Sequence, residues 1–306
     1  MTALQIDLPE HFLDEEVRDG YTVTRQMKEV WAVELDLLHQ VQKICEKYNI
    51  EYFADGGTLL GAVRHKGFIP WDDDIDLKMD RENYEKFCSV AKNELKSPYF
   101  YQTEETDSQT IFGCLKIRNS RTTMIIEKQF QRNFSYNQGI WLDIFVYDNI
   151  PDDEIQFKKF QKKLILIKKK AHKFRNYSRL NLNERNFVKK ILGKIVSIFK
   201  IKNFYYFRLN KKSQEFNESE TECFAAMFFR PERTAGFEKK IYFAEKKYLD
   251  FEFLKIPVPS DYDAVLTENY GNWKEFVVGS NFHGNVIIDT DKPYTEYMKR
   301  KPEEIK

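Results

Sequence analysis

The chain has 306 residues, of which 42% are hydrophobic and 32% charged, with 12 glycines and 9 prolines. This composition is typical of a folded globular protein and excludes collagen-like, low-complexity and largely disordered chains. The formal net charge is only +1, which argues against a protein that binds polyanions over its whole surface. The charge is unevenly distributed, however. The segment 158–212 contains 19 lysines and arginines and one acidic residue, a net charge of +18, so the remainder carries −17.

The first residues, MTALQIDLPEHFLDEE, have neither the basic start nor the apolar stretch of a secretory signal. No apolar run approaches the roughly 18 residues that a membrane-spanning helix needs. The four cysteines form no CxxC pair, which argues against a zinc site or a disulfide framework. We therefore expect a reduced, cytoplasmic protein.

Apolar spacing predicts helices that alternate with strands in the first half of the chain, followed by a basic helical segment. In chain order we expect a helix over 22–48, a strand over 52–55, a helix over 58–65 capped by Asp55 or Thr58, a strand over 74–79, a helix over 81–95, strands near 99–103, 111–118, 122–127 and 140–147, two basic helices within 158–212, and a helix over 261–270. This order predicts an α+β fold, with a mixed β-sheet core flanked by helices.

We divide the chain into three parts. Residues 1–150 are expected to form the catalytic core with its N-terminal helix, and residues 151–235 a basic helical insert. Residues 236–306 are expected to form a C-terminal α/β part that completes the catalytic domain.

The segment from Asp55 to Leu77 carries the motif with the clearest chemistry. Side chains alternate along a strand, so Asp74 and Asp76 are expected on one side, in a row that can include Asp72, while Asp73 points away. Neighbouring carboxylates of this kind suit Mg²⁺ or Mn²⁺, which also bind phosphate oxygens. A DDD run alone is commonly a solvated turn. The order strand, Gly-Gly, helix, loop and DxD within 22 residues instead favours phosphoryl or nucleotidyl transfer.

Further candidates lie on other elements. Asp143 is flanked by large apolar residues, where a carboxylate needs a cation or proton partner, and it is expected to be a third metal ligand or the general base. The alternative for Asp143 is a solvent-facing edge strand. Lys116 and Arg64 are candidates for neutralising phosphate charge, although a surface ion pair explains Arg64 equally well.

Three blocks of the sequence resemble the LicD family of phosphocholine transferases, to which the fukutin-related proteins also belong. The blocks are 52–79, 139–148 and, less specifically, 256–273. The resemblance implies a nucleotidyltransferase-like fold. It also implies transfer of a phospho-substituent from a CDP-activated donor to a glycan hydroxyl, with release of CMP.

The resemblance also assigns roles to residues. Asp74 and Asp76 match the metal-binding pair, Asp143 matches the third carboxylate, and Gly56, Gly57 and Thr58 match the phosphate-contacting turn. The expected cofactor is Mg²⁺ or Mn²⁺.

The predicted activity is the transfer of phosphocholine from CDP-choline to a cell-surface glycan or a teichoic-acid-type precursor. Transfer of ribitol or glycerol phosphate from the CDP-polyol is the nearest alternative. Attachment of a nucleotide to an acceptor, and a non-enzymatic membrane-binding scaffold, are the others. Aromatic residues near the acidic motifs, Trp71 and Trp141, permit recognition of a quaternary ammonium but do not establish it.

The basic insert has a helix-like pattern over 187–207, in which apolar residues recur every three or four positions with lysines between them. This pattern is typical of an interfacial amphipathic helix. We therefore expect peripheral contact of 158–212 with an anionic membrane at the inner face of the plasma membrane, near a lipid-linked acceptor. The alternative is a helix packed on the catalytic core with solvated lysines. Nucleic acid is not an expected partner, because no nucleic-acid motif accompanies the charge.

Overall fold

The computed structural model describes residues 2–107, 110, 112–126, 136–179, 188, 191, 193–195, 201–233, 237–277 and 286–298. The chain divides into two compact units. Unit 1 comprises Met1–Gln102, Leu115–Phe145 and Tyr242–Lys306, and unit 2 comprises Thr103–Cys114 and Val146–Ile241.

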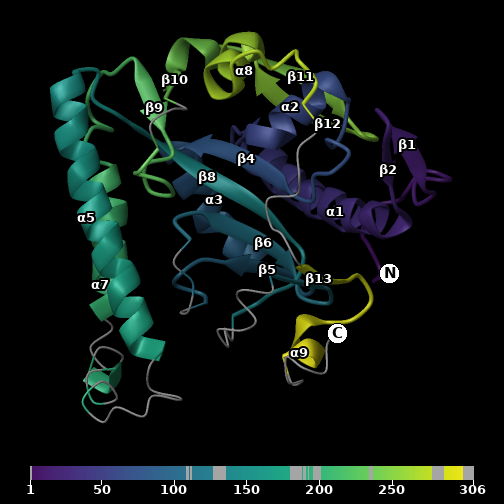
Figure 1. Ribbon diagram of the computed structural model, residues 1–306, viewed down its shortest axis with the longest axis horizontal. Helices are drawn as coiled ribbons and strands as arrows, with labels where there is room; N and C mark the ends of the chain where they lie inside the picture. Colours follow the sequence, from purple (N-terminus) through teal and green to yellow (C-terminus); the bar gives the residue numbers. More distant parts are fainter. Residues whose placement is uncertain are drawn as a thin grey trace. The chain divides into compact units, whose positions relative to one another are not determined.

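Unit 1 is built on a β-sheet in which strands distant in sequence lie side by side (Figure 1). The strand order is β3 (Phe53–Ala54), β4 (Ile75–Asp80), β8 (Trp141–Asn149), β6 (Leu115–Asn119) and β5 (Tyr99–Gln102). Strand β8 is therefore central among these five strands: it pairs with β4 on one side and with β6 on the other. The antiparallel register of β6 and β8 places Lys116 opposite Asp143.

Three helices of unit 1 connect or cover these strands, and each begins at a side-chain cap of the kind that satisfies free backbone N–H groups. They are α1 (Arg25–Tyr48) with Thr24 as N-cap, α2 (Gly56–Arg64) with Asp55, and α3 (Arg81–Glu94) with Asp80. Helix α1 contacts α3 and β6. Its Val30 and Val33 pack with Met124, Ile140 and Trp141 in a buried cluster, which fixes α1 against the start of β8.

The remaining elements of unit 1 form small pairs around this sheet. They are β1 (Glu16–Arg18) with β2 (Tyr21–Val23), β7 (Thr123–Ile126) with β13 (Val286–Asp289), β11 (Lys246–Phe251) with β12 (Leu254–Pro259), and the helices α8 (Tyr262–Tyr270) and α9 (Tyr294–Tyr297).

Unit 2 contains two long helices, α5 (Glu154–Arg179) and α7 (Ile201–Ser213), which pack against each other. The rings of Phe174 and Tyr205 stack between them, 5.2 Å apart. The end of β8 pairs antiparallel with β9 (Cys223–Ala225), which in turn pairs with β10 (Glu238–Lys239). A short 3₁₀ helix, Lys240–Phe243, spans the boundary between the two units.

The predicted α+β fold, with a mixed sheet flanked by helices, is confirmed. The helix expected over 58–65 begins two residues earlier, because Asp55 rather than Thr58 is its cap. Much of the helix expected over 187–207 lies outside the described residues. The described residues of its first part, 188, 191 and 193–195, are helical, and its last part lies in α7.

Among the helices that the structure describes, none is both long enough and apolar enough to cross a membrane.

Candidate active site

Three carboxylates that are far apart in the sequence converge in unit 1. Asp74 directly precedes β4, Asp76 lies within it, and Asp143 lies in the neighbouring strand β8. One carboxylate oxygen of each lies within 4.8 Å of the others. All the donors are hard oxygen atoms, the ligand type that Mg²⁺ and Mn²⁺ prefer, so this set fits such a cation.

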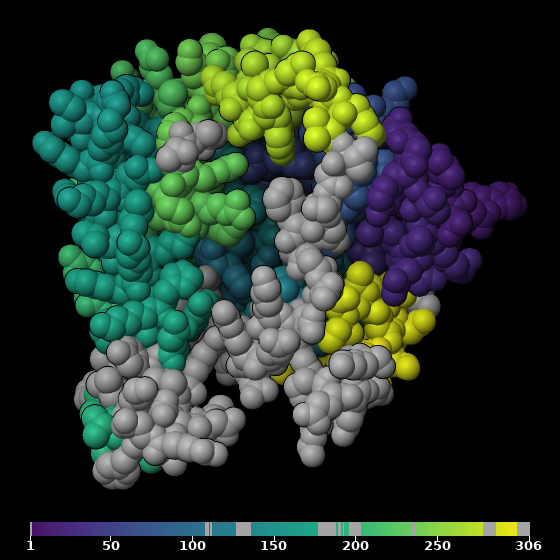
Figure 2. Space-filling model, viewed as in Figure 1, coloured from purple at the N-terminus to yellow at the C-terminus, as the bar shows by residue number. Residues whose placement is uncertain are grey.

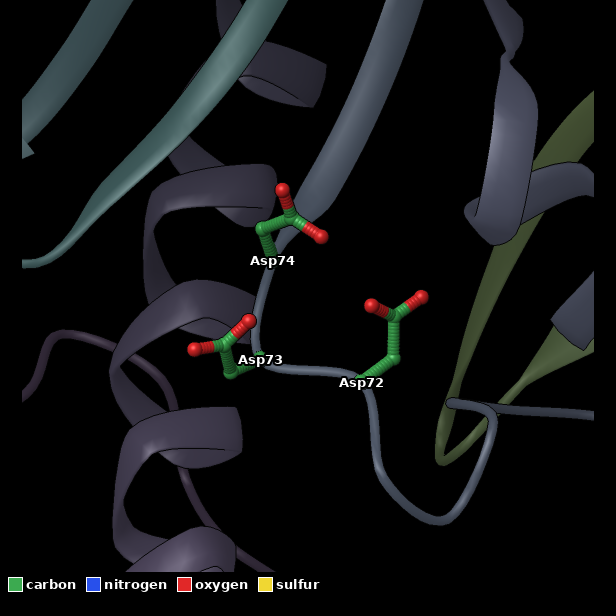
Figure 3. A group of neighbouring side chains, drawn as sticks. All are labelled: Asp72, Asp73 and Asp74. Carbon is green, nitrogen blue, oxygen red and sulfur yellow. The ribbon is translucent and has the colours of Figure 1, made fainter. Parts of the chain in front are cut away.

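A second acidic group occupies the loop before β4 and shares Asp74 with the first. Its members, Asp72, Asp73 and Asp74, also have ligand atoms within 4.8 Å of one another. In Figure 3 Asp73 points toward α1, whereas Asp72 projects to the other side of the loop. The indole Nε1 of Trp31 in α1 donates to the Asp72 carbonyl at 2.8 Å, which holds the loop against that helix.

The acidic residues repel one another. Burial raises the pKa of the Asp76 carboxyl well above its usual range, and the charges of Asp74 and Asp143 raise it further. Burial likewise raises the pKa of Asp72, with added repulsion from Asp74 and Asp73. Such a concentration of negative charge is stabilised by a bound cation.

Asp143 is held in place by two neighbours. The Lys116 ammonium donates to both of its carboxylate oxygens at 2.6 Å, and Trp141 Nε1 donates to Oδ2 at 3.0 Å. Lys116 also lies 4.7 Å from the centre of the Trp141 ring. Lys116 and Asp143 are both buried. Asp143 therefore does not lie on a solvent-facing surface, and Lys116, expected to contact phosphate, is paired with it.

The Gly-Gly turn lies directly against the acidic residues. Gly56 has φ +49°, a conformation that favours glycine, and a Cβ there would lie 3.4 Å from Asp76 Oδ2. A Cβ on Gly57 would lie 2.5 Å from Asp72 Oδ2. Thr58 Oγ1 accepts a hydrogen bond from Asp76 N at 2.8 Å. The N-terminus of α2 is thus packed onto the acidic loop and strand, and contact of this turn with phosphate stays a prediction.

Arg64 lies at the other end of α2, where its guanidinium contacts the C-terminal segment. Its Nη1 donates to the Trp273 carbonyl at 3.3 Å, and it stacks 5.0 Å from the centre of the Phe276 ring. The structure therefore does not bring Arg64 into the acidic group.

Two features of the site were not predicted from the sequence. Asp55 forms a buried ion pair with Lys78 at 2.8 Å besides capping α2. Glu34, on the buried face of α1, is fully inaccessible, and burial followed by the charges of Asp74 and Asp73 raises the pKa of its carboxyl well above the usual range. The available signal was an acid placed among the apolar residues of a predicted amphipathic helix.

Comparison with known proteins places this site in a family. Residues 49–193 match the LicD/FKTN/FKRP nucleotidyltransferase domain. This range includes every candidate site residue named above except Glu34, Trp31 and the partners of Arg64. The lipopolysaccharide cholinephosphotransferase LicD of Haemophilus influenzae is 30% identical over 254 residues, which cover 81% of this chain and 91% of that protein. The chain belongs to the LicD family. It is accordingly a phosphotransferase.

Shorter matches relate the chain to other proteins. An uncharacterized protein of Rickettsia prowazekii is 47% identical over 116 residues, 38% of this chain and 39% of that protein. The ribitol 5-phosphate transferase FKRP of the mouse is 27% identical over 103 residues, 33% of this chain and 21% of that protein.

Proposed function

We propose that the protein transfers phosphocholine from CDP-choline to a hydroxyl of a cell-surface glycan or teichoic-acid-type precursor, with release of CMP. The observation that carries this proposal is the similarity to a cholinephosphotransferase along 91% of that relative's length. The convergent carboxylates Asp74, Asp76 and Asp143 support it, because transfer of a phospho-group needs positive charge held beside the diphosphate.

In the proposed reaction the acceptor hydroxyl oxygen attacks the choline-bearing phosphorus. The bond from that phosphorus to the bridging diphosphate oxygen breaks, and CMP leaves with the electron pair. The hydroxyl proton passes to Asp143 as general base. Since Lys116 donates to both Asp143 oxygens at 2.6 Å, its ammonium must first turn away. Turned toward the diphosphate, it offsets the charge of the departing CMP.

The proposed cofactor is Mg²⁺ or Mn²⁺, held by one oxygen each of Asp74, Asp76 and Asp143. When bound there, it would polarise the diphosphate oxygens. The chain's own residues fix the ligands: Thr58 Oγ1 anchors the backbone of Asp76, and Trp141 orients Asp143.

Release of CMP from CDP-choline tests this function. With Mg²⁺ and an acceptor, the parent protein should release CMP and move the choline label to the acceptor. The Asp76→Asn variant should lose most of this activity, whereas Asp250→Asn, an exposed control in unit 1, should retain it. Nucleotide label on the acceptor, or no CMP from any CDP-alcohol, contradicts the proposal.

A polyol-phosphate donor is the second candidate, because a ribitol 5-phosphate transferase is also similar to this chain, over 33% of its length. Thermal unfolding in the presence of CDP-choline, CDP-ribitol or CDP-glycerol separates the two, since a ligand that binds only the folded protein raises its melting temperature. A larger shift with CDP-ribitol than with CDP-choline favours the second candidate.

We further propose that unit 2 binds the inner face of an anionic membrane, where a lipid-linked acceptor is held. Helix α5 lies at the surface of unit 2 (Figure 2, teal). Its exposed lysines are Lys158, Lys159, Lys162, Lys163, Lys169, Lys170 and Lys173. Apolar Leu166, Phe204 and Phe207 on α5 and α7 are also exposed. Basic and apolar groups together favour an interfacial contact.

Co-sedimentation with phosphatidylcholine vesicles, with and without phosphatidylglycerol, tests this contact. Binding should require the anionic lipid and should weaken at high salt. The Lys162→Glu/Lys163→Glu variant should bind less than Lys43→Glu/Lys92→Glu, which reverses two exposed lysines of unit 1. Equal binding by both variants removes the proposal for α5.

A further inference from the structure

Tyr270, in the C-terminal part of unit 1, lies beside the candidate active site. It is the last residue of α8, a helix that contacts α2 and is anchored by the buried side chains of Val265 and Leu266 (Figure 1). A Cβ built on Gly56 would lie 3.8 Å from the Tyr270 hydroxyl oxygen and 3.4 Å from Asp76 Oδ2. The phenol hydroxyl and the carboxylate therefore border the same point next to Gly56.

The space at this point is open. Apart from the residues next to Gly56 and the backbone of α2, Tyr270 Oη and Asp76 Oδ2 are the only heavy atoms of the described residues within 4 Å of it. Tyr270 is 45% exposed, so a molecule in solution can reach its side chain. A ligand that enters this space meets a hydrogen-bond donor on one side and a proposed cation ligand on the other.

The chain that follows Tyr270 is attached to α2. Gly271 ends α8 with φ +66°, a left-handed conformation that glycine adopts without strain. Two residues later, the Trp273 carbonyl accepts a hydrogen bond from Arg64 Nη1 at 3.3 Å. Arg64 is the last residue of the helix that begins at Gly56. Tyr270 therefore has a defined position relative to the Gly-Gly turn.

A cation held by Asp76 would bring substrate oxygens within reach of the Tyr270 hydroxyl. Mg²⁺ binds its ligands at about 2.1 Å, so a phosphate oxygen on the same ion lies roughly 3–4 Å from the carboxylate oxygen that holds it. A hydroxyl donates to such an oxygen over about 2.7 Å. One phosphate oxygen can therefore occupy the space beside Gly56, bound to the cation and to Tyr270 at the same time.

We propose that Tyr270 binds the diphosphate of the donor, by donating a hydrogen bond to one of its non-bridging oxygens. Phosphate oxygens are negatively charged acceptors, which a phenol hydroxyl suits as donor, whereas the quaternary ammonium of choline can neither donate nor accept. The contact is therefore to the part of the donor that all CDP-linked alcohols share. This inference rests on the proposed function, because it takes such a compound as donor, but it does not depend on which alcohol is transferred.

Isothermal titration calorimetry with Mg²⁺ and without acceptor tests the contact, with CDP-choline and CDP as probes. Tyr270→Phe, which removes only the hydroxyl, should weaken binding of both by the same factor, about 10- to 100-fold, the range for a hydrogen bond to a charged group. Tyr262→Phe is the matched control, at the other end of α8, where its ring lies 5.6 Å from Lys247 Nζ. It should bind both as the parent does. Neither variant should change the affinity for Mn²⁺, since the hydroxyl is not a proposed cation ligand.

Equal affinities of Tyr270→Phe and Tyr262→Phe for CDP-choline overturn the inference and leave the proposed function in place. A loss with CDP-choline but not with CDP assigns the hydroxyl to the alcohol, and weaker Mn²⁺ binding assigns it to the cation site; either result also overturns the inference. A parent that binds neither nucleotide overturns the inference and the proposed function together. Equal losses, with no CMP released by the parent, retain the inference and overturn the proposed reaction. Circular dichroism checks folding, and if Tyr270→Phe fails to fold, Tyr270→Leu decides the question by the same criterion.

Discussion

Replacing Lys116 with methionine tests how strongly one buried ion pair stabilises the acidic site. Lys116 and Asp143 are only 8% and 6% exposed, and the ammonium lies 2.6 Å from both carboxylate oxygens. Removing one partner of a buried pair costs about 3–5 kcal/mol. We therefore expect Lys116→Met to lower the free energy of unfolding by about 3–5 kcal/mol.

A double-mutant cycle measures this coupling directly. Lys116→Met, Asp143→Asn and the double variant would be unfolded in urea without divalent ions. All four tryptophans lie in unit 1, so their fluorescence follows the unit that contains the pair. The double variant should recover much of the stability that Lys116→Met loses, with a coupling of about 2 kcal/mol or more. Additive losses, or a Lys116→Met variant as stable as the parent, would refute the reasoning.

Two further changes test the packing and the electrostatics. Gly57→Ala should leave stability within about 1 kcal/mol of the parent, because alanine favours a helix by about 0.5–1 kcal/mol. It should nevertheless weaken Mn²⁺ binding, because the added Cβ displaces the Asp72 carboxylate, one oxygen of which lies within 4.8 Å of an oxygen of the proposed ligand Asp74; unchanged Mn²⁺ affinity contradicts this. In unit 2, burial and then the Arg175 charge lower the pKa of His172 to about 4. The unfolded chain therefore takes up a proton at His172 near pH 6.5, whereas the folded chain does so only near pH 4. The free energy of unfolding is consequently highest above about pH 6.5 and falls as the pH drops toward 4. Urea midpoints should fall less between pH 7.5 and 5 for His172→Gln than for the parent, and equal slopes contradict this.

Local periodicity was sufficient to predict the elements that carry the acids. The spacing of apolar residues in α1 and the alternation in β4 depend only on the 3.6- and two-residue repeats of helix and strand. The alternation also predicts that Asp73 points away from Asp72 and Asp74. Its side chain does turn toward α1 (Figure 3), but one of its carboxylate oxygens still lies within 4.8 Å of an oxygen of each neighbour, because the three residues lie in the loop before β4 rather than in the strand. What periodicity cannot supply is the strand order. Asp143 meets Asp74 and Asp76 only because β8 pairs with β4, and for that the sequence offered family resemblance rather than geometry.

Contacts between elements account for what the sequence did not predict. Lys116 reaches Asp143 because the register of β6 and β8 sets the two residues opposite each other. Both Asp55 and Thr58 are chemically suited to cap α2. Asp55 is the cap, and the Thr58 hydroxyl instead accepts from Asp76 N. Glu34 could be placed on the buried face of a helix, but only the fold shows that the acidic loop contacts the same helix, through Trp31.

The net charge of +1 says little about binding, because charges act over a short range in solution. At physiological salt, exposed charges are screened beyond roughly 8 Å, so each charged group acts mainly on partners that lie close to it. The two kinds of charge should also respond differently to salt. Binding of the exposed α5 lysines to anionic lipid should weaken as ionic strength rises. The Lys116–Asp143 pair, which is far less exposed than the α5 lysines, should keep more of its coupling energy. The distribution of charge between surface and interior therefore matters more for function than its sum.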